Sequence, residues 1–306
     1  MELFNIVRKM RSRFSPMRLF HIFENMGYHL TPNHFYFPIP DTRSLGDYLW
    51  ERESQLVGVD MNTEGQMNLL SIFESTYKNE YEKIPKDETD SPHLYFLNNN
   101  DFFSIDGLIL YCMIRYFKPN KILEVGSGYS TLLAAQALEK NQLESGQASE
   151  LIAIEPYPNE ILQKGFPGLS RLIKMKAQDV PLSEFEKLGK NDILFIDSSH
   201  VLSIGNDVQY EYLEILPRIN PGVLIHIHDI FFPNEYPKKW TLERHHFWTE
   251  QYILQAFLAF NNKFEAIWAS NYMLAKHPDK LEEAFNYKKI EGSPYHIASF
   301  WMRRKE

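Results

Sequence analysis

Short apolar runs alternate with helical patterns from Ser104 to the C-terminus, and this alternation most constrains how the chain can fold. The runs predict strands at Lys121 to Val125, Leu151 to Glu155, Arg171 to Met175, Asp192 to Asp197, Val223 to His228, Phe264 to Ala269 and His296 to Met302. Strands that alternate with helices usually pair in parallel through crossover connections. The chain therefore predicts an α/β fold with one mostly parallel, seven-stranded sheet and helices on both faces.

Helical periodicity fills the segments around these strands. The predicted helices are Ile105 to Phe117, Ser130 to Lys140, Asn159 to Lys164, Leu182 to Leu188, Asn206 to Leu216, Leu242 to Phe260 and Pro278 to Phe285. The last two strands are joined differently from the earlier strand–helix–strand units. We therefore expect one of them to run antiparallel at the edge of the sheet.

Residues 1–100 lack the alternation and are rich in aromatic residues and prolines, notably from His34 to Pro40. We predict two regions: an N-terminal, aromatic-rich cap that faces the substrate (1–100) and a catalytic domain (101–306). Basic and apolar residues interleave from Met1 to Phe20. That pattern favours a surface helix, with a helix lying at a membrane interface as the alternative.

Composition narrows the possible partners. The formal net charge is −8, from 32 basic and 40 acidic residues, so nucleic acid is not an expected partner. A single cysteine, Cys112, fits a reducing compartment, and no run of 18 apolar residues predicts a transmembrane helix. The N-terminus also lacks the pattern of a signal peptide. We expect a cytoplasmic protein.

The segment from Ile122 to Thr131 is the most informative part of the chain. It reads as a buried strand that ends in Glu124, followed by a turn with Gly126 and Gly128 that opens a helix. A dinucleotide site would require a third glycine where Thr131 stands, and no carboxylate beside its pyrophosphate. Glu124 instead suits a ligand that presents an ammonium group, as the methionyl end of S-adenosylmethionine does.

Further polar residues at the predicted strand ends suit the same cofactor. Glu155 ends the second strand, where its carboxylate can accept hydrogen bonds from two ribose hydroxyls. Asp179 follows the third strand and can accept from the adenine amino group. The remaining predicted cofactor contacts are Ser127, Ser130 and Asp197.

In these residues the sequence resembles the class I S-adenosylmethionine-dependent methyltransferases. The resemblance rests on Glu124-x-Gly126-x-Gly128, Glu155 and Asp179 in the order and spacing of that family, and it covers about residues 100 to 306. It implies a Rossmann-like sheet, S-adenosylmethionine as cofactor and a methyl acceptor as substrate. The family includes O-methyltransferases of polysaccharides, antibiotics and other natural products, so we expect a hydroxyl on a small molecule or glycan.

The fourth and fifth strands end in ionisable residues that should face one crevice. These residues are Asp197, His200, His228 and Asp229. One reading makes His200 or His228 the general base, with Asp197 or Asp229 orienting the imidazole. The other gives Asp197, Asp229 and His228 to a divalent metal.

Relatives of the catechol and sugar type hold magnesium with carboxylates from these strand ends. Ile230 stands where the catechol type has an amide, and the histidines suit softer metals better than magnesium. Both readings therefore stay open, and so does a purely structural, hydrogen-bonding role for these residues.

Other residues near this crevice have simpler interpretations. His226 lies deeper on the same strand as His228 and is interpreted as a core histidine. Trp248 is interpreted as core packing that borders the acceptor pocket. The segment Phe231 to Pro237 is either a packed loop or a loop whose aromatic side chains contact a substrate ring or sugar. Asp106 and Tyr129 are methionyl contacts or helix caps.

Other classes of function fit less well. A nicotinamide- or nucleotide-sugar-dependent oxidoreductase needs a third glycine in the turn, which this sequence lacks, and the Glu124 carboxylate would repel the phosphates of its cofactor. A non-catalytic protein with a methyltransferase fold would leave the histidine and aspartate cluster without a use. The sequence does not determine the oligomeric state, although the cap can cover its own active site or that of a second copy in a homo-oligomer.

Overall fold

The computed structural model describes residues 16–286 and 297–306. The chain divides into two compact units, residues 1–49 and 50–306. Most of the basic stretch from Met1 to Phe20 lies outside the described residues, so its two interpretations remain predictions. Among the described residues, no helix has the length and apolar character needed to cross a bilayer.

The first unit contains little regular structure. Helix α2 (Pro16–Glu24) and the short 3₁₀ helix η1 (Thr42–Ser44) are joined by a segment whose aromatic side chains are exposed. Phe35 and Tyr36 are each 82% exposed. Their role as a substrate-facing cap remains a prediction.

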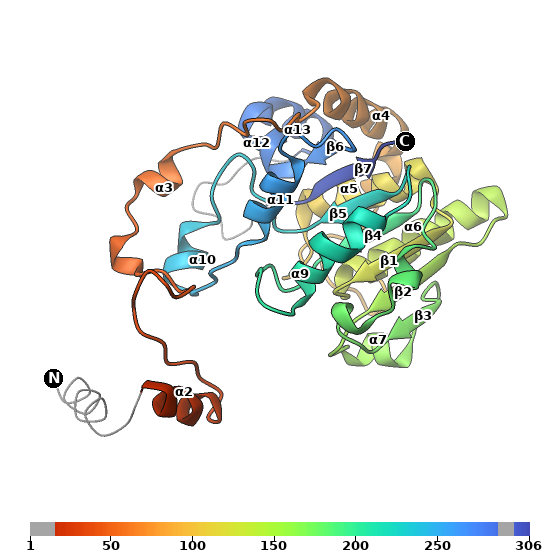
Figure 1. Ribbon diagram of the computed structural model, residues 1–306. Helices are drawn as coiled ribbons and strands as arrows, with labels where there is room; N and C mark the ends of the chain where they lie inside the picture. Colours follow the sequence, from red (N-terminus) through yellow and green to blue (C-terminus); the bar gives the residue numbers. More distant parts are fainter. Residues whose placement is uncertain (1–15, 287–296) are drawn as a thin grey trace. The chain divides into compact units, whose positions relative to one another are not determined.

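A seven-stranded sheet forms the centre of residues 50–306 (Figure 1). Its strands are β1 (Lys121–Val125), β2 (Glu150–Ile154), β3 (Arg171–Ile173), β4 (Ile193–Ile196), β5 (Leu224–Ile227), β6 (Phe264–Ala269) and β7 (Phe300–Arg304). The spatial order is β3-β2-β1-β4-β5-β7-β6. The prediction of a Rossmann-like, mostly parallel sheet is confirmed.

The antiparallel strand is not where we expected it. Strand β7 runs antiparallel to both β5 and β6 and lies between them, so β6 forms the edge. The physical reason is burial: Phe300, Trp301 and Met302 of β7 are all inaccessible to solvent, which suits an inner strand.

Helices surround the sheet on both faces. In residues 50–306 they are α4 (Thr63–Tyr81), α5 (Ser104–Phe117), α6 (Tyr129–Ser145), α7 (Glu160–Lys164), η2 (Ala177–Asp179), α8 (Leu182–Phe185), α9 (Asp207–Tyr210), η3 (Glu211–Ile215), η4 (Leu216–Arg218), α10 (Lys238–Leu242), α11 (Glu250–Leu258), α12 (Ser270–Lys276) and α13 (Pro278–Phe285). Helix α3 (Tyr48–Glu51) begins in the first unit and has no buried residue. Most predicted helices are present with shifted ends. The η3 segment is a π-helical turn.

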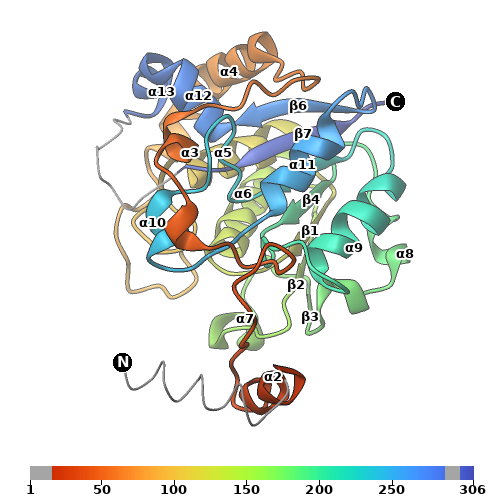
Figure 2. The same cartoon turned by 60° about the vertical axis from the view of Figure 1, so that its left-hand side comes forward.

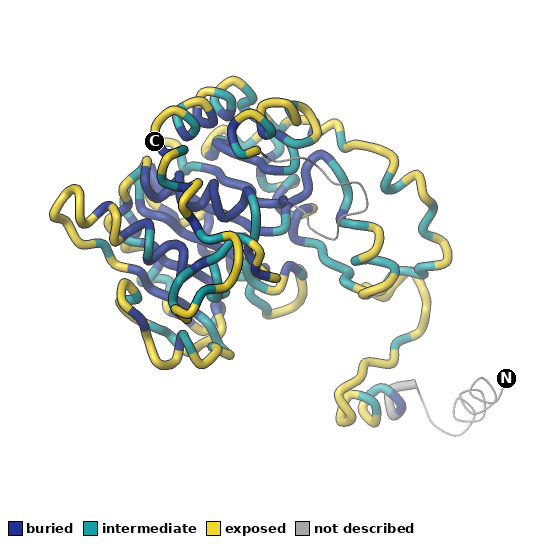
Figure 3. Tube along the Cα trace, turned by 180° about the vertical axis from the view of Figure 1, so that it is seen from behind, coloured by how far each residue is buried: buried dark blue, intermediate teal, exposed yellow. Residues whose placement is uncertain are grey.

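Two hydrophobic cores hold the layers together. One joins the sheet to α4, α5 and α6, and the other joins its opposite face to α8, α9 and α11 (Figure 2). Strand side chains alternate between the two cores, as Phe195 and Ile196 of β4 do. The central strands are therefore buried on both sides, as Figure 3 shows.

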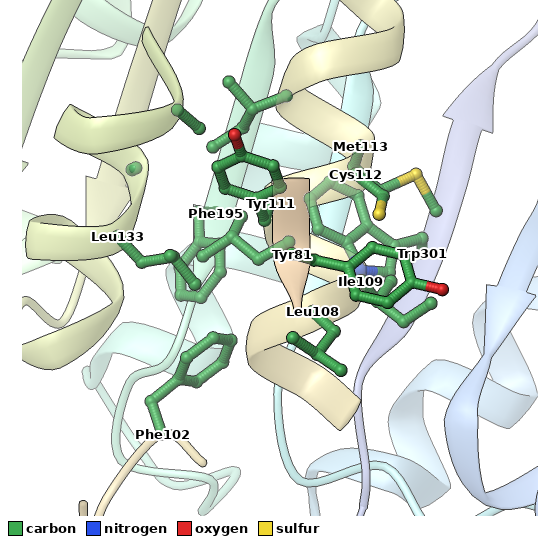
Figure 4. Close-up of a cluster of buried hydrophobic side chains, with 14 of the residues drawn as sticks. Tyr81, Phe102, Leu108, Ile109, Tyr111, Cys112, Met113, Leu133, Phe195 and Trp301 are labelled. Carbon is green, nitrogen blue, oxygen red and sulfur yellow. The ribbon is translucent and has the colours of Figure 1, made fainter. Parts of the chain in front are cut away.

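Residues 50–100 pack as part of the catalytic unit. Phe73 and Tyr81 of α4 are almost fully buried, and Figure 4 shows Tyr81 close to side chains of α5 and to Trp301. Arg115 of α5 is buried and bonds to Glu80 of α4 at 2.8 Å and to Glu144 of α6 at 2.7 Å. The compact unit thus begins near residue 50, and the predicted division at residue 100 does not follow the packing.

The predicted helix Leu242 to Phe260 is wrong. Helix α10 ends at Leu242, residues 243–249 are not helical, and α11 begins at Glu250. The backbone N–H groups of Thr249 and Glu250 donate to the carbonyl of His200, at 2.9 and 3.1 Å. A tertiary contact, which no helical periodicity reveals, therefore decides where α11 starts.

Replacing Phe73 tests whether α4 belongs to the catalytic unit. Phe73→Ala should lower the free energy of unfolding of the whole unit by about 3–5 kcal/mol, because it leaves a cavity in the core. Leu143→Ala is the control, because Leu143 is 78% exposed. Urea unfolding followed by circular dichroism measures both, and an unchanged midpoint for Phe73→Ala would show that α4 is a separate cap.

Candidate active site

The glycine turn joins β1 to α6 and lies directly against the end of β4. Gly126 has a φ of +77°, and a Cβ atom there would overlap the carbonyl oxygen of Asp197. The N–H of Asp197 donates to the carbonyl of Val125 at 2.8 Å. Only glycine allows this close approach between the two strand ends.

Thr131 stands where a dinucleotide site would have its third glycine. Its hydroxyl accepts a hydrogen bond from the N–H of Gly128 at 3.0 Å and so closes the turn. A Cβ at Gly128 would meet no atom within 4 Å. The space beside Gly128 is therefore open.

A cavity of about 390 Å³ lies at the carboxyl ends of β1, β2 and β4, and we call it the first cavity. Of the predicted cofactor contacts, Gly126, Glu155 and Asp197 line it. Glu155 also accepts hydrogen bonds from the N–H groups of Ser127 and Tyr157, at 3.3 and 2.8 Å. The place of Glu155 at the end of β2 agrees with the sequence prediction.

Glu124 is buried beneath the turn rather than on the cavity wall. Its side chain is 1% exposed, and Oε1 accepts from the hydroxyl of Ser130 at 2.6 Å. Burial raises the pKa of Glu124 to about 8, although Ser130 and Thr131 oppose the shift. Its Oε2 atom and the hydroxyl of Ser127 are buried without a partner among the described residues.

The adenine side of the first cavity differs from the prediction. Asp179 is exposed and does not line the cavity, whereas its neighbour Gln178 does. The 3₁₀ turn η2 decides which of the two side chains points inward. Oε1 of Gln178 is buried and has no partner among the described residues.

The four ionisable residues predicted to converge do so. Nε2 of His200 lies 3.3 Å from Oδ1 of Asp197 and 3.5 Å from Oδ2 of Asp229. Nδ1 of His228 lies 3.4 and 3.8 Å from the same two atoms. Ligand atoms of Asp197, His200 and Asp229 all lie within 4.8 Å of one another, a spacing at which they can share a metal ion.

Opposite charges set the pKa values in this cluster. Burial alone would lower the pKa of both histidines, but Asp197 and the other carboxylates outweigh burial and raise each pKa well above its ordinary value. Burial would raise the pKa of Asp197, yet the two histidines hold it well below its usual range. For Asp229, burial dominates and raises the pKa.

Two acidic residues complete the cluster, and sequence analysis did not give either this role. Glu250 is fully buried at the start of α11, with Oε2 2.9 Å from Nδ1 of His200. Asp106, at the start of α5, accepts from Ser270 and from the backbone of Ala298, and its Oδ2 lies 3.7 Å from Nε2 of His228. In the sequence, only the carboxylate side chains of these two residues pointed to such a role, because a carboxylate that becomes buried needs a partner.

A second cavity of about 500 Å³ also borders the cluster. Asp106, Asp197, His228 and Asp229 form one part of its lining. The rest is aromatic or polar: Asn100, Asp101, Phe103, Trp240, Arg244, His246 and Trp248. Asp197 lines both the first and the second cavity.

The neighbouring residues follow the simpler interpretations. His226 is a core histidine that bonds to Ser299 at 2.9 Å and stacks on Phe195. The segment Phe231 to Pro237 packs inward, with Phe231 and Tyr236 almost fully buried, and no residue of it lines the second cavity. Trp248, which we interpreted as core packing, lines the second cavity.

Comparisons with known proteins agree with this geometry. A family model described as Methyltransferase domain matches residues 123–230, from β1 to the end of β5. An uncharacterized protein of Archaeoglobus fulgidus is 33% identical over 169 residues, which are 53% of this chain and 75% of that protein.

A solved structure is more distantly similar: the MycE methyltransferase from the mycinamycin biosynthetic pathway in complex with Mg and SAH. The match covers 63% of this chain and 47% of the MycE chain, so this chain spans about half the length of MycE. The sequence identity is 15% and the TM-score is 0.33. A similarity at that score carries no functional argument.

The chain belongs to the class I S-adenosylmethionine-dependent methyltransferases. It is an enzyme, and S-adenosylmethionine is its cofactor. The first cavity fits this cofactor, because it lies at the carboxyl edge of the sheet and its lining includes Glu155 and Gln178, whose side chains can form hydrogen bonds. The family assignment disfavours the oxidoreductase and non-catalytic alternatives.

Two glycine substitutions test the tight contact at the turn. Gly126→Ala should weaken S-adenosylmethionine binding at least about tenfold and destabilise the protein, because its Cβ has no space and its φ is positive. Gly128→Ala meets open space and should leave the fold intact. Calorimetric titration with thermal unfolding measures both effects, and equal behaviour of the two variants would contradict this account of the turn.

Proposed function

We propose that the protein transfers a methyl group from S-adenosylmethionine to a hydroxyl oxygen of a small molecule or sugar. The observation that carries the proposal is the position of Asp197, which lines both cavities and lies within 3.4 Å of a nitrogen of each histidine. A cofactor in the first cavity and an acceptor in the second would meet at this residue. S-adenosylmethionine supplies an electrophilic methyl group, so the protein must align the acceptor and take up its proton.

The cofactor contacts are part of the proposal. Glu155 is suited to the ribose hydroxyls and Gln178 to the adenine amino group, because both residues line the first cavity and carry acceptor oxygens. Glu124 lies beneath the turn with one unpartnered oxygen, near Ser127 and Ser130. Its position supports a role at the methionyl end, where an ammonium group would favour the ionised carboxylate.

His228 is the proposed general base. It lines the second cavity, and Asp106 holds the far side of its ring. Its raised pKa depends on Asp197 and Asp229. When a cation neutralises those two carboxylates, they no longer raise the pKa, although Asp106 still does, so the pKa falls and His228 can accept the hydroxyl proton.

A divalent cation is the second part of the proposal. Asp197, His200 and Asp229 would hold it, in place of the predicted set with His228. Charge supports this choice, because Asp106, Asp197, Asp229 and Glu250 outnumber two imidazoles in a cluster with little solvent exposure. A bound cation would balance that charge and lower the pKa of a hydroxyl that contacts it.

The lining of the second cavity supports a hydroxylated ring as acceptor. Trp240 and Trp248 present aromatic surfaces with ring centres 5.1 Å apart, and Asn100 and Asp101 add hydrogen-bonding groups. Apolar surface with a few polar groups is typical of small-molecule sites. A cytoplasmic location and a homo-oligomer remain proposals, the first supported by the buried free thiol of Cys112.

The test is methyl transfer to a panel of sugars, nucleotide sugars and catechols, followed by mass spectrometry. His228→Gln should lower turnover by about 10²–10⁴-fold and leave S-adenosylmethionine affinity unchanged, because general base catalysis contributes that factor. His226→Gln removes a buried imidazole of β5, two residues before His228, and should keep the turnover of the folded protein. Wild-type turnover in His228→Gln would exclude His228 as the base.

A further inference from the structure

Glu250 and His200 form a buried pair that the proposed reaction does not explain by itself. Both side chains are at least 93% buried, and Nδ1 of His200 faces Glu250 while Nε2 faces Asp197 and Asp229. The other oxygen of Glu250 accepts from the hydroxyl of Tyr212 at 3.2 Å. Glu250 therefore has no polar atom free to contact a substrate.

The backbone is arranged to bring these two residues together. His200 has a positive φ of 59°, which is uncommon for a residue other than glycine. Its carbonyl accepts from both Thr249 and Glu250, and the N–H of Leu202 donates to the Thr249 hydroxyl at 2.7 Å. The ring of Trp248 packs against His200 at 4.5 Å between ring centres.

We propose that Glu250 is a positioning residue that makes Nε2 of His200 a metal ligand, and that the site therefore prefers divalent transition ions to Mg²⁺. Oε2 of Glu250 lies 2.9 Å from Nδ1 of His200 and can accept the hydrogen of Nδ1, so Nε2 is the ring nitrogen directed at Asp197 and Asp229. Without a metal, a hydrogen on Nε2 faces these carboxylates, and a divalent ion bound there would take the place of that hydrogen and accept the lone pair of Nε2. Carboxylate–histidine pairs of this kind orient the ring and raise its affinity for metal.

The choice of ion follows from the ligand types. An imidazole nitrogen suits transition ions, whereas Mg²⁺ prefers oxygen ligands. This inference rests on the proposed metal-assisted function, yet it predicts binding rather than turnover. It can therefore be tested without knowing the acceptor.

The experiment is calorimetric titration of the full chain with Co²⁺ alone and with Mg²⁺ alone. Wild-type protein should bind Co²⁺ more tightly than Mg²⁺. Glu250→Gln should weaken Co²⁺ binding by about 10–100-fold, which is the usual effect of removing a carboxylate that hydrogen-bonds to a metal-binding histidine. The affinity for Mg²⁺ should change much less, so the ratio of the Co²⁺ affinity to the Mg²⁺ affinity should become smaller in Glu250→Gln than in the wild type. A general structural role for Glu250 would not produce that selective change.

Glu211→Gln is the matched control. Glu211 is also fully buried, but it accepts from Ser198 at 3.0 Å and forms no hydrogen bond or ion pair with His200. This variant should keep the Co²⁺ affinity of the wild type, and Glu250→Gln should keep S-adenosylmethionine affinity, because Glu250 does not line the first cavity.

Two outcomes would overturn the inference: no preference for Co²⁺ in the wild type, or loss of metal and cofactor binding together in Glu250→Gln. Absence of methyl transfer with intact, Glu250-dependent Co²⁺ binding would instead count against the proposed function.

Discussion

The contact between the glycine turn and the end of β4 is the constraint on which the site depends. Gly126 lies so close to the carbonyl of Asp197 that no side chain fits, and the N–H of Asp197 bonds to Val125. These two backbone contacts fix the position of the Asp197 backbone, from which its side chain extends. From there the carboxylate reaches two histidines and forms part of the wall of both cavities.

Burial makes the charges of this site strong and interdependent. In water, an ion pair of this kind contributes little, whereas here both histidines are buried and each charged group depends on its neighbours. The two histidines lower the pKa of Asp197, and the carboxylates raise the pKa of both histidines. A change in the charge at any one position, by cofactor, cation or substitution, should therefore alter proton affinity at the others.

Much of the fold was predictable because it depends on local patterns. Apolar strands and a glycine turn determined the sheet, and polar residues at parallel strand ends predicted the meeting of Asp197, His200, His228 and Asp229. The errors have tertiary causes. No glycine or proline interrupts the sequence between Leu242 and Phe260, yet the helix breaks because Thr249 and Glu250 bond to His200. Likewise, the turn at η2 selects Gln178 over Asp179, and only the packed structure shows Asp106 beside His228.

The most direct test of the account is Asp197→Asn, measured for both S-adenosylmethionine affinity and methyl transfer. The account predicts weaker cofactor binding and a loss of turnover of at least about 10²-fold, because one carboxylate serves both cavities and neutralising it leaves two buried imidazoles without their main partner. Thermal unfolding of the same variant reports whether the fold survives. A folded Asn variant that binds the cofactor and transfers methyl groups like the wild type would contradict the central role of Asp197.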